Sequence, residues 1–216
     1  MIDSLKVNNK TTLGLGSHLC DKHEIIKMLD ISNDQVIAID CFGEYVQMAK
    51  EVGGKVIDFG LSNPDHAHIN VFDVSVDYSQ SQNIIKNKID FLVEFFDLIM
   101  GAEMSPLQIS IIEECTKSVY NEYLSSMTES GKYNSDLLPT LKDLYEKLIK
   151  ENDTYAGELA RAIEIFVCDK YDWFEKKTDI EFSNKFVVID LQNVRPDCRD
   201  LLTTAVKELV NVRWQI

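Results

Sequence analysis

The chain has 216 residues, of which 45% are hydrophobic and 27% charged, a balance typical of a globular protein that buries its own core. Its formal net charge of −14 opposes direct binding to nucleic acid, because lysine and arginine on phosphates supply most of that affinity. The five cysteines show no Cys-x-x-Cys pair, no signal peptide is visible, and no apolar run reaches the ~20 residues of a membrane helix. We therefore expect a cytoplasmic protein without membrane insertion.

The first elements predicted are a strand over residues 11–17, entering a glycine-containing turn, and an amphipathic helix over residues 21–30. Residues 1–10 are polar and fit either a short strand or a frayed start. In the helix, Ile25, Ile26 and Leu29 follow helical spacing, so we expect this face to pack on a sheet.

A short apolar run, residues 36–39, then ends at Asp40. This pattern is typical of a buried parallel strand that carries an acid to the carboxyl edge of a sheet, where ligands bind in open α/β sheets. The alternative interpretation is that Asp40 only caps the following helix, predicted over residues 42–52. A second strand is predicted over residues 55–59.

From residue 76 the pattern changes to long amphipathic stretches. Helices are predicted over residues 78–100, 107–124 and 137–150 and from residue 153 to 167, and their apolar stripes are assigned to the core. Strand character returns over residues 185–191, before a last helix that opens at Arg195-Pro196-Asp197. These elements predict an α/β fold in three parts: residues 1–75, a helical part over 76–182, and residues 183–216.

Three short motifs resemble those of a known family. They are Asp40-Cys41-Phe42-Gly43-Glu44-Tyr45, Gly53-Gly54 and Ile69-Asn70-Val71-Phe72-Asp73. In order and spacing they resemble the Asp-Pro-Glu-Gly-Glu-Tyr, Gly-Gly and Ile-Asn-Pro-Phe-Asp motifs of the motor ATPases of conjugative DNA transfer and type IV secretion, the VirB-four class, kin to the FtsK and HerA pumps. The resemblance implies a partial RecA-like P-loop parallel sheet with an inserted all-α helical subdomain.

The resemblance also assigns site positions. The family motif positions are Asp40, Gly43, Glu44, Tyr45 and Asn70, whereas Cys41, Phe42 and Val71 depart from the family pattern.

In this family the nucleotide-binding loop lies before the first helix and needs the pattern G-x-x-x-x-G-K-[ST]. Aligned from Gly16, the chain keeps Gly16 and Lys22, but Asp21 replaces the second glycine, His23 replaces the hydroxyl residue, and Leu19 stands where a further glycine is frequent. The degenerate loop is thus marked by Gly16, Ser17, Lys22 and His23. Lys22 is either a phosphate ligand or a solvated lysine in the first turn of a helix, and we prefer the second interpretation. We predict no catalytic residue and no ATP or Mg²⁺ as cofactor.

The family's Walker B strand would follow the last helix and its large N-terminal domain would precede the first strand, and neither is in this sequence. The resemblance therefore implies a truncated, catalytically inactive relative that docks on conjugation motor or transfer-channel proteins, at the inner face of the membrane when it is bound there. Self-association is also expected, because a sheet without its later strands leaves an unpaired edge. Two alternatives stay open: a nucleotide-binding subunit of a split ATPase, completed by a partner chain and using ATP and Mg²⁺, and a decayed gene product without a cellular role.

The tripeptide His66-Ala67-His68 places two imidazoles at i and i+2, which could hold a metal with one more ligand. A solvent-exposed loop is the preferred interpretation, so no metal site is predicted.

Overall fold

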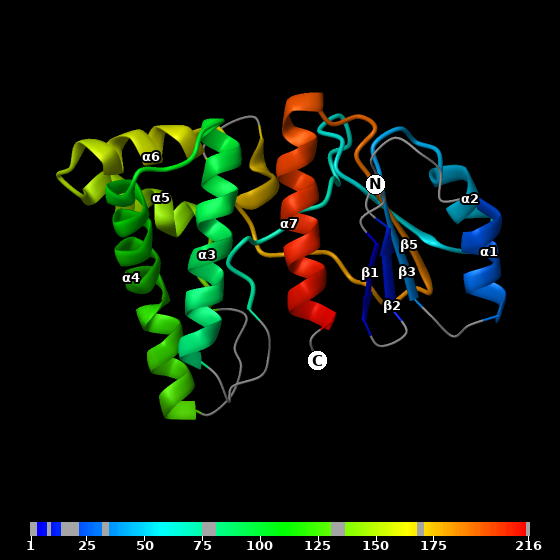
Figure 1. The fold of residues 1–216 in the computed structure, drawn as a ribbon, viewed down its shortest axis with the longest axis horizontal. Helices are drawn as coiled ribbons and strands as arrows, with labels where there is room; N and C mark the ends of the chain where they lie inside the picture. The colour runs from blue at the N-terminus through cyan, green and yellow to red at the C-terminus, as the bar shows by residue number, and fades with distance from the viewer. Residues whose placement is uncertain are drawn as a thin grey trace. The chain divides into compact units, whose positions relative to one another are not determined.

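The computed structural model describes residues 4–7, 10–13, 22–31, 35–74, 81–130, 137–167 and 171–214. They form two compact units, the first reaching to Ala67 and including Asp179–Thr203, the second comprising His68–Thr178 and the chain from Thr204 onward. Figure 1 shows the elements of both units.

The first unit is built on one five-stranded sheet. Its strands are β1 (Ser4–Val7), β2 (Lys10–Leu13), β3 (Gln35–Asp40), β4 (Lys55–Asp58) and β5 (Phe186–Asp190), in the spatial order β1-β2-β3-β5-β4. β1 pairs antiparallel with β2, and the other neighbours are parallel. The predicted partial parallel sheet of an α/β fold is confirmed. Of the two alternatives for residues 1–10, a short strand or a frayed start, β1 supports the strand.

β3 and β5 are buried along almost their whole length. This burial explains why both read as continuous apolar runs, since strands covered on both faces have no solvent side to show as alternation. Helices α1 (Lys22–Ile31) and α2 (Val46–Glu51) belong to the same unit (Figure 1). Side chains from β3, β5, α1 and α2 make one core cluster: Ile25, Val36, Ala38, Tyr45, Met48, Ala49, Phe186 and Val188.

Several details of the predicted helices were wrong. The helix predicted over residues 137–150 begins at Leu141, and the one predicted to reach residue 167 ends at Glu164. Ile26 is 39% exposed, so only Ile25 and, in part, Leu29 reach the core cluster. The helix predicted from residue 42 begins at Val46, because Asp40 accepts the peptide N–H groups of residues 42–45 and holds them in a turn.

The second unit is helical. It holds α3 (Ser81–Met100), α4 (Pro106–Ser130), α5 (Leu141–Lys150), α6 (Thr154–Glu164) and the short 3-10 helix η3 (Asp172–Phe174), all inserted between β4 and β5. Helix α7 (Pro196–Trp214) starts in the first unit and contributes its residues from Thr204 onward to the second. The predicted all-α insertion is thus confirmed.

Aromatic rings fill the interior of the helical unit. Phe95 packs edge-on against Phe174 with 5.2 Å between ring centroids, and Tyr171 stacks on Trp173 at 5.1 Å. The apolar stripes were therefore correctly assigned to the core. A charged group is also buried here: Lys88 is 2% exposed and donates to Glu208 at 2.6 Å. Burial lowers the pKa of the Lys88 ammonium, and the Glu208 carboxylate opposes that shift.

Within the part of the chain that the structure describes, no helix has both the length and the apolar character needed to cross a membrane.

Candidate functional site

Three parallel strands of the first unit end in aspartates that lie side by side. Asp40 ends β3, Asp190 ends β5 and Asp58 ends β4, and the register pairs Asp40 with Asp190 and Asp190 with Asp58. Neighbouring strands are roughly 4.8 Å apart, so three carboxylates follow one another along the carboxyl edge of the sheet. In open α/β sheets this edge is where ligands bind, and it is the candidate functional site.

Asp40 is the most enclosed of the three and is fully buried. Its Oδ1 accepts the N–H groups of Phe42, Gly43 and Glu44 at 3.1, 2.8 and 3.1 Å, and its Oδ2 accepts that of Tyr45 at 2.8 Å. Both interpretations of Asp40 are therefore partly right. The residue reaches the carboxyl edge, but its oxygens cap the turn that leads into α2.

Asp58 and Asp190 organise the other two loops of this edge. Asp58 accepts the Gly60 N–H at 2.7 Å and the Asn63 side-chain amide at 3.1 Å, and Asp190 accepts the Gln192 N–H at 2.9 Å. Burial raises the pKa of the Asp190 carboxyl, and the charges of Asp58 and Asp40 raise it further. The Gln192 N–H and the Lys50 ammonium act in the opposite direction. The edge is thus an acidic row whose carboxylates mainly shape the protein's own loops.

Gly43 lets the loop that follows β3 (the first loop) approach the loop that follows β5 (the third loop). Its φ of +76° is in the left-handed region, and a Cβ added at this position would lie 2.3 Å from the Gln192 Oε1. The Arg199 side chain holds the third loop by donating from Nε to the Val194 carbonyl at 3.1 Å and from Nη2 to the Gln192 carbonyl at 2.9 Å. The left-handed backbone favours glycine here, and an added side chain would in addition displace the flexible Gln192 side chain.

The outward side of the first loop presents an aromatic ring. Phe42 is 57% exposed, and the Arg199 guanidinium lies 5.9 Å from the centre of its ring. Cys41 is half-buried, and burial raises the pKa of its thiol. These are the two positions where the loop departs from the family pattern, and both contribute little to the core cluster.

The remaining predicted residues of the first unit lie in two places. Lys22 and His23 are exposed in the first turn of α1. Gly16 and Ser17 lie outside the described residues, as do Leu19 and Asp21. Glu44 is exposed, and Tyr45 buries its ring in the core cluster.

Asn70 lies in the helical unit and is 2% exposed. Its backbone N–H donates to the Thr178 hydroxyl at 2.8 Å, its amide donates to the Pro139 carbonyl at 2.8 Å, and its Oδ1 accepts the Phe72 N–H at 3.0 Å. Asn70 therefore joins three segments that are far apart in the sequence. The structure brings Asp40, Gly43, Glu44 and Tyr45 into one loop and gives Asn70 a separate, internal position.

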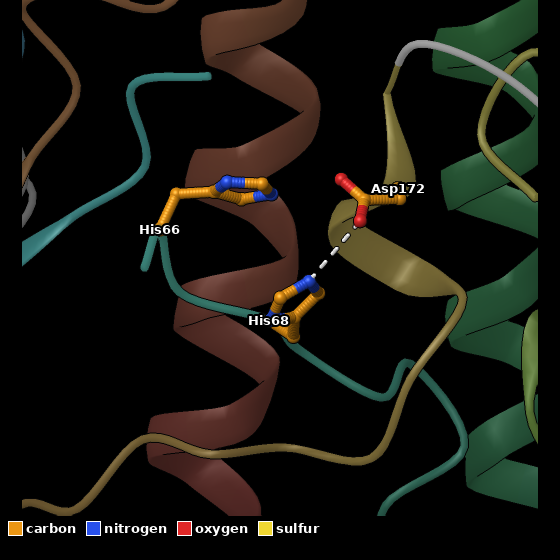
Figure 2. A group of neighbouring side chains, drawn as sticks. All are labelled: His66, His68 and Asp172. Carbon is orange, nitrogen blue, oxygen red and sulfur yellow. Dashed lines mark hydrogen bonds and ion pairs between the residues drawn. The ribbon is translucent and has the colours of Figure 1, made fainter. Parts of the chain in front are cut away.

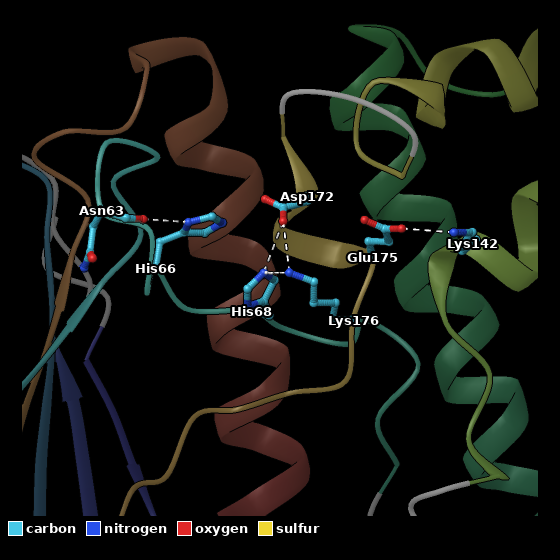
Figure 3. A network of polar contacts seen from close by, with 7 residues as sticks. All are labelled: Asn63, His66, His68, Lys142, Asp172, Glu175 and Lys176. Carbon is cyan, nitrogen blue, oxygen red and sulfur yellow. Dashed lines mark hydrogen bonds and ion pairs between the residues drawn. The ribbon is translucent and has the colours of Figure 1, made fainter.

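A second polar cluster lies in the helical unit, around η3. His68 is buried, and its Nε2 lies 3.4 Å from the Asp172 Oδ2 (Figure 2). The Lys176 ammonium lies 3.1 Å from the same His68 nitrogen and 3.2 Å from the same Asp172 oxygen, and Glu175 pairs with Lys142 at 3.0 Å (Figure 3). The expectation of an exposed loop was wrong for His68, and the Lys176 ammonium contacts both its imidazole and the Asp172 carboxylate.

Sequence reasoning missed the other members of both clusters. The sequence does contain a signal for Asp58 and Asp190 as members of the acidic row, because β3, β4 and β5 all end in Ile-Asp. The sequence contains no such signal for Asp172, since it is 104 residues from His68 and only the fold brings the two together.

No protein-family model matches this sequence, and no curated protein matches it. Among solved structures, the chain is similar to the structure of VirB4 of Thermoanaerobacter pseudethanolicus, with a TM-score of 0.69 and 22% sequence identity, covering 90% of this chain and 76% of that chain. A likeness at this level of identity establishes a shared fold. It therefore confirms, at the level of the fold, the resemblance carried by the three sequence motifs.

Proposed function

Since the chain has the fold of VirB4 and carries motifs that resemble those of the VirB-four class, we propose that it is a catalytically inactive relative of the conjugation and type IV secretion motors that acts by docking on a motor or a transfer-channel protein. The observation that carries this proposal is that the Asp40–Tyr45 motif keeps the residues that build its loop and differs at two residues that stay outside the core cluster. Asp40, Gly43 and Tyr45 build the loop, and the family pattern is kept at these positions. Phe42 is exposed and Cys41 is half-buried, and at these two positions the pattern has changed.

This division supports a protein that preserves the fold of a motor without preserving its chemistry. An exposed phenylalanine beside a guanidinium, as at Phe42 and Arg199, is a surface suited to protein contacts, which are enriched in aromatic residues and arginine.

The sequence of the degenerate loop supports inactivity. In the alignment Asp21 places a carboxylate where a motor has a glycine against phosphate. At an effective dielectric constant near 20, one like charge at ~4 Å costs about 4 kcal/mol, roughly a thousandfold in affinity. His23 replaces the hydroxyl that would bind Mg²⁺, an ion that prefers oxygen ligands.

The docking function is tested by mixing the purified chain with the purified motor ATPase of the same transfer system and measuring complex formation by size-exclusion chromatography. We expect a complex that forms without nucleotide. A chain that binds neither the motor nor the channel proteins of that system contradicts the proposal. We place the protein in the cytoplasm, at the inner membrane face when it is bound to the transfer complex, and without direct contact to nucleic acid.

Inactivity is tested by calorimetry with Mg·ATP. We expect no binding by the unmodified chain, and binding without turnover by the triple variant Leu19→Gly, Asp21→Gly, His23→Ser. Phosphate release by the unmodified chain above that of a Lys22→Ala control would instead favour a subunit of a split ATPase.

A further inference from the structure

An apolar groove lies on the helical unit, along α3 and α4. The two helices are joined by the short connection 101–105 and lie side by side (Figure 1). The groove has a volume of about 520 Å³. Its apolar lining comes from three residues of α3, each separated by one helical turn, and two of α4: Ile85, Ile89, Val93, Ile109 and Leu124.

Charged side chains line the same groove in an ordered way. α3 contributes Lys86 and Asp90, one turn apart, and α4 contributes Glu113 and Lys117, which are also one turn apart and form an ion pair. Because the short connection makes the helices antiparallel, Asp90 and Glu113 both lie toward the connection, and Lys86 and Lys117 both lie toward the other end. The groove therefore carries a pair of acids and, one helical turn further from the connection, a pair of lysines beside its apolar floor.

We propose that this groove binds an amphipathic helix of a partner protein, with apolar residues at i, i+4 and i+7 and with one acidic and one basic residue a turn apart beside that stripe. The acidic residue of the partner faces Lys86 and Lys117, and the basic residue faces Asp90 and Glu113. Opposite charges at matching positions fix the direction and register of the bound helix. The inference rests on the proposed docking function and names the surface that performs it.

A helix fits this groove better than a second copy of the chain does. A concave apolar surface is filled by a convex one, and two copies that meet groove to groove leave the space between them empty. Each copy also carries a net charge of −14, so that association of two copies works against long-range repulsion.

The test uses two fluorescein-labelled synthetic helical peptides of about 15 residues, a length at which a helix needs stabilising residues such as alanine. Both peptides carry leucine at i, i+4 and i+7 and have the same composition. In the first, one Glu and one Lys flank the leucines a turn apart, and in the second the two charges lie on the opposite face. Fluorescence anisotropy with the full chain measures binding. We expect the first peptide to bind about tenfold more tightly, and this advantage to shrink at high salt.

Matched variants of α4 locate the binding surface. Ile109→Asp places a charge on the groove floor and is expected to weaken binding of the first peptide about tenfold or more. Leu107→Asp is the control, since Leu107 is 59% exposed on the same helix and does not line the groove. Lys117→Glu changes only the exposed rim, so it tests the proposal even if Ile109→Asp fails to fold. It is expected to weaken binding of the first peptide more than binding of the second.

Equal binding of the two peptides, or binding that Ile109→Asp and Lys117→Glu both leave unchanged, overturns the proposal. Light scattering that shows a dimer of the unmodified chain, dissociated by Ile109→Asp but not by Leu107→Asp, assigns the groove to a second copy and overturns it as well. If the motor binds the unmodified chain and both groove variants equally, the groove inference fails while the docking function stands. If the motor binds none of them, the docking function itself fails.

Discussion

The Asp40 carboxylate accepts the backbone N–H of Tyr45 at 2.8 Å, while the Tyr45 ring is buried in the core cluster together with Val36 and Ala38. One residue of the motif thus fixes the backbone of another, whose side chain fastens the loop to the sheet. The motif can therefore be kept for the fold alone, because neither the hydrogen bond from Tyr45 to Asp40 nor the burial of the Tyr45 ring requires a ligand. This relationship is a structural reason to retain Asp40 and Tyr45 that does not depend on nucleotide binding.

The first prediction concerns this capping role. Replacing Asp40 with alanine removes the acceptor of four N–H groups, of which the one on Tyr45 is buried. An unpaired buried donor costs about 1–3 kcal/mol, and water can satisfy those of the exposed residues, so we expect Asp40→Ala to lower the free energy of unfolding by about 3 kcal/mol. Urea denaturation measures the change.

Glu44→Ala is the control for Asp40→Ala, since Glu44 is an exposed acid of the same loop. We expect it to change stability by less than about 0.5 kcal/mol. Equal effects of the two substitutions would contradict a structural role for the Asp40 carboxylate.

The second prediction separates two contributions to the loss of stability when Gly43 is replaced, the left-handed backbone and the contact with Gln192. Gly43→Ala places a side chain at φ +76° and brings its Cβ within 2.3 Å of the Gln192 Oε1. Gly53 has a similar φ of +72° but no atom within 4 Å of an added Cβ. We expect Gly53→Ala to cost about 1 kcal/mol for the backbone alone, and Gly43→Ala about 0.5–1.5 kcal/mol more, because the flexible Gln192 side chain must leave its present rotamer. Thermal denaturation compares the two variants.

The double variant Gly43→Ala, Gln192→Ala completes this comparison. It removes the conflicting amide, so its stability should return to about that of Gly53→Ala. If the second substitution does not restore stability, the close approach of the two loops is not the reason for the glycine.

Most elements could be predicted from the sequence because their burial is simple. β3 and β5 are buried on both faces, which gives uninterrupted apolar runs, and α3 to α6 each bury a stripe with helical spacing. The order of the strands could not be predicted. β5 lies between β3 and β4 although 127 residues separate the end of β4 from the start of β5, and no local pattern states which strands will pair.

The candidate site was predictable in position but not in detail. An acid after an apolar run placed Asp40 correctly at the carboxyl edge. The late start of α2 was not predictable, because helical spacing does not show that a carboxylate will take the N–H groups of residues 42–45. The role of Asn70 depends on Pro139 and Thr178, which are remote in sequence.

The third prediction tests Asn70. Asn70→Ala leaves the Phe72 N–H and the Pro139 carbonyl without the partners they have in the structure, so we expect a loss of about 3 kcal/mol in the free energy of unfolding. Asn70→Asp keeps the acceptor for Phe72 but sets a carboxylate oxygen against the Pro139 carbonyl, and it should be no more stable than the alanine variant at neutral pH. Asn121→Ala, at an exposed position of α4, is the control. Urea denaturation measures the free energy of unfolding. Equal losses for Asn70→Ala and Asn121→Ala would show that the hydrogen bonds of Asn70 do not stabilise the helical unit.

The fourth prediction concerns the pH dependence that Asp190 gives to stability. Asp190 is 8% exposed, and burial, followed by the charges of Asp58 and Asp40, raises its pKa above the ordinary value of 3.8. Between 3.8 and this raised pKa, the folded state binds more protons than the unfolded state. The free energy of unfolding contributed by Asp190 therefore falls as the pH rises through this interval, and the ionised carboxylate is a penalty at neutral pH.

Asp190→Asn removes that penalty while its side-chain oxygen can still accept the Gln192 N–H. We expect the variant to be more stable than the unmodified chain at neutral pH, and the difference to shrink toward pH 3.8 and to disappear well below it, where Asp190 is uncharged in both states. Asp200→Asn removes the same unit of charge at an exposed position of α7 and controls for the reduction of the net charge. Urea denaturation across this pH range measures all three proteins. A variant that is less stable than the unmodified chain at neutral pH, with Asp200→Asn unchanged, would mean that the fold depends on the ionised carboxylate at the end of β5.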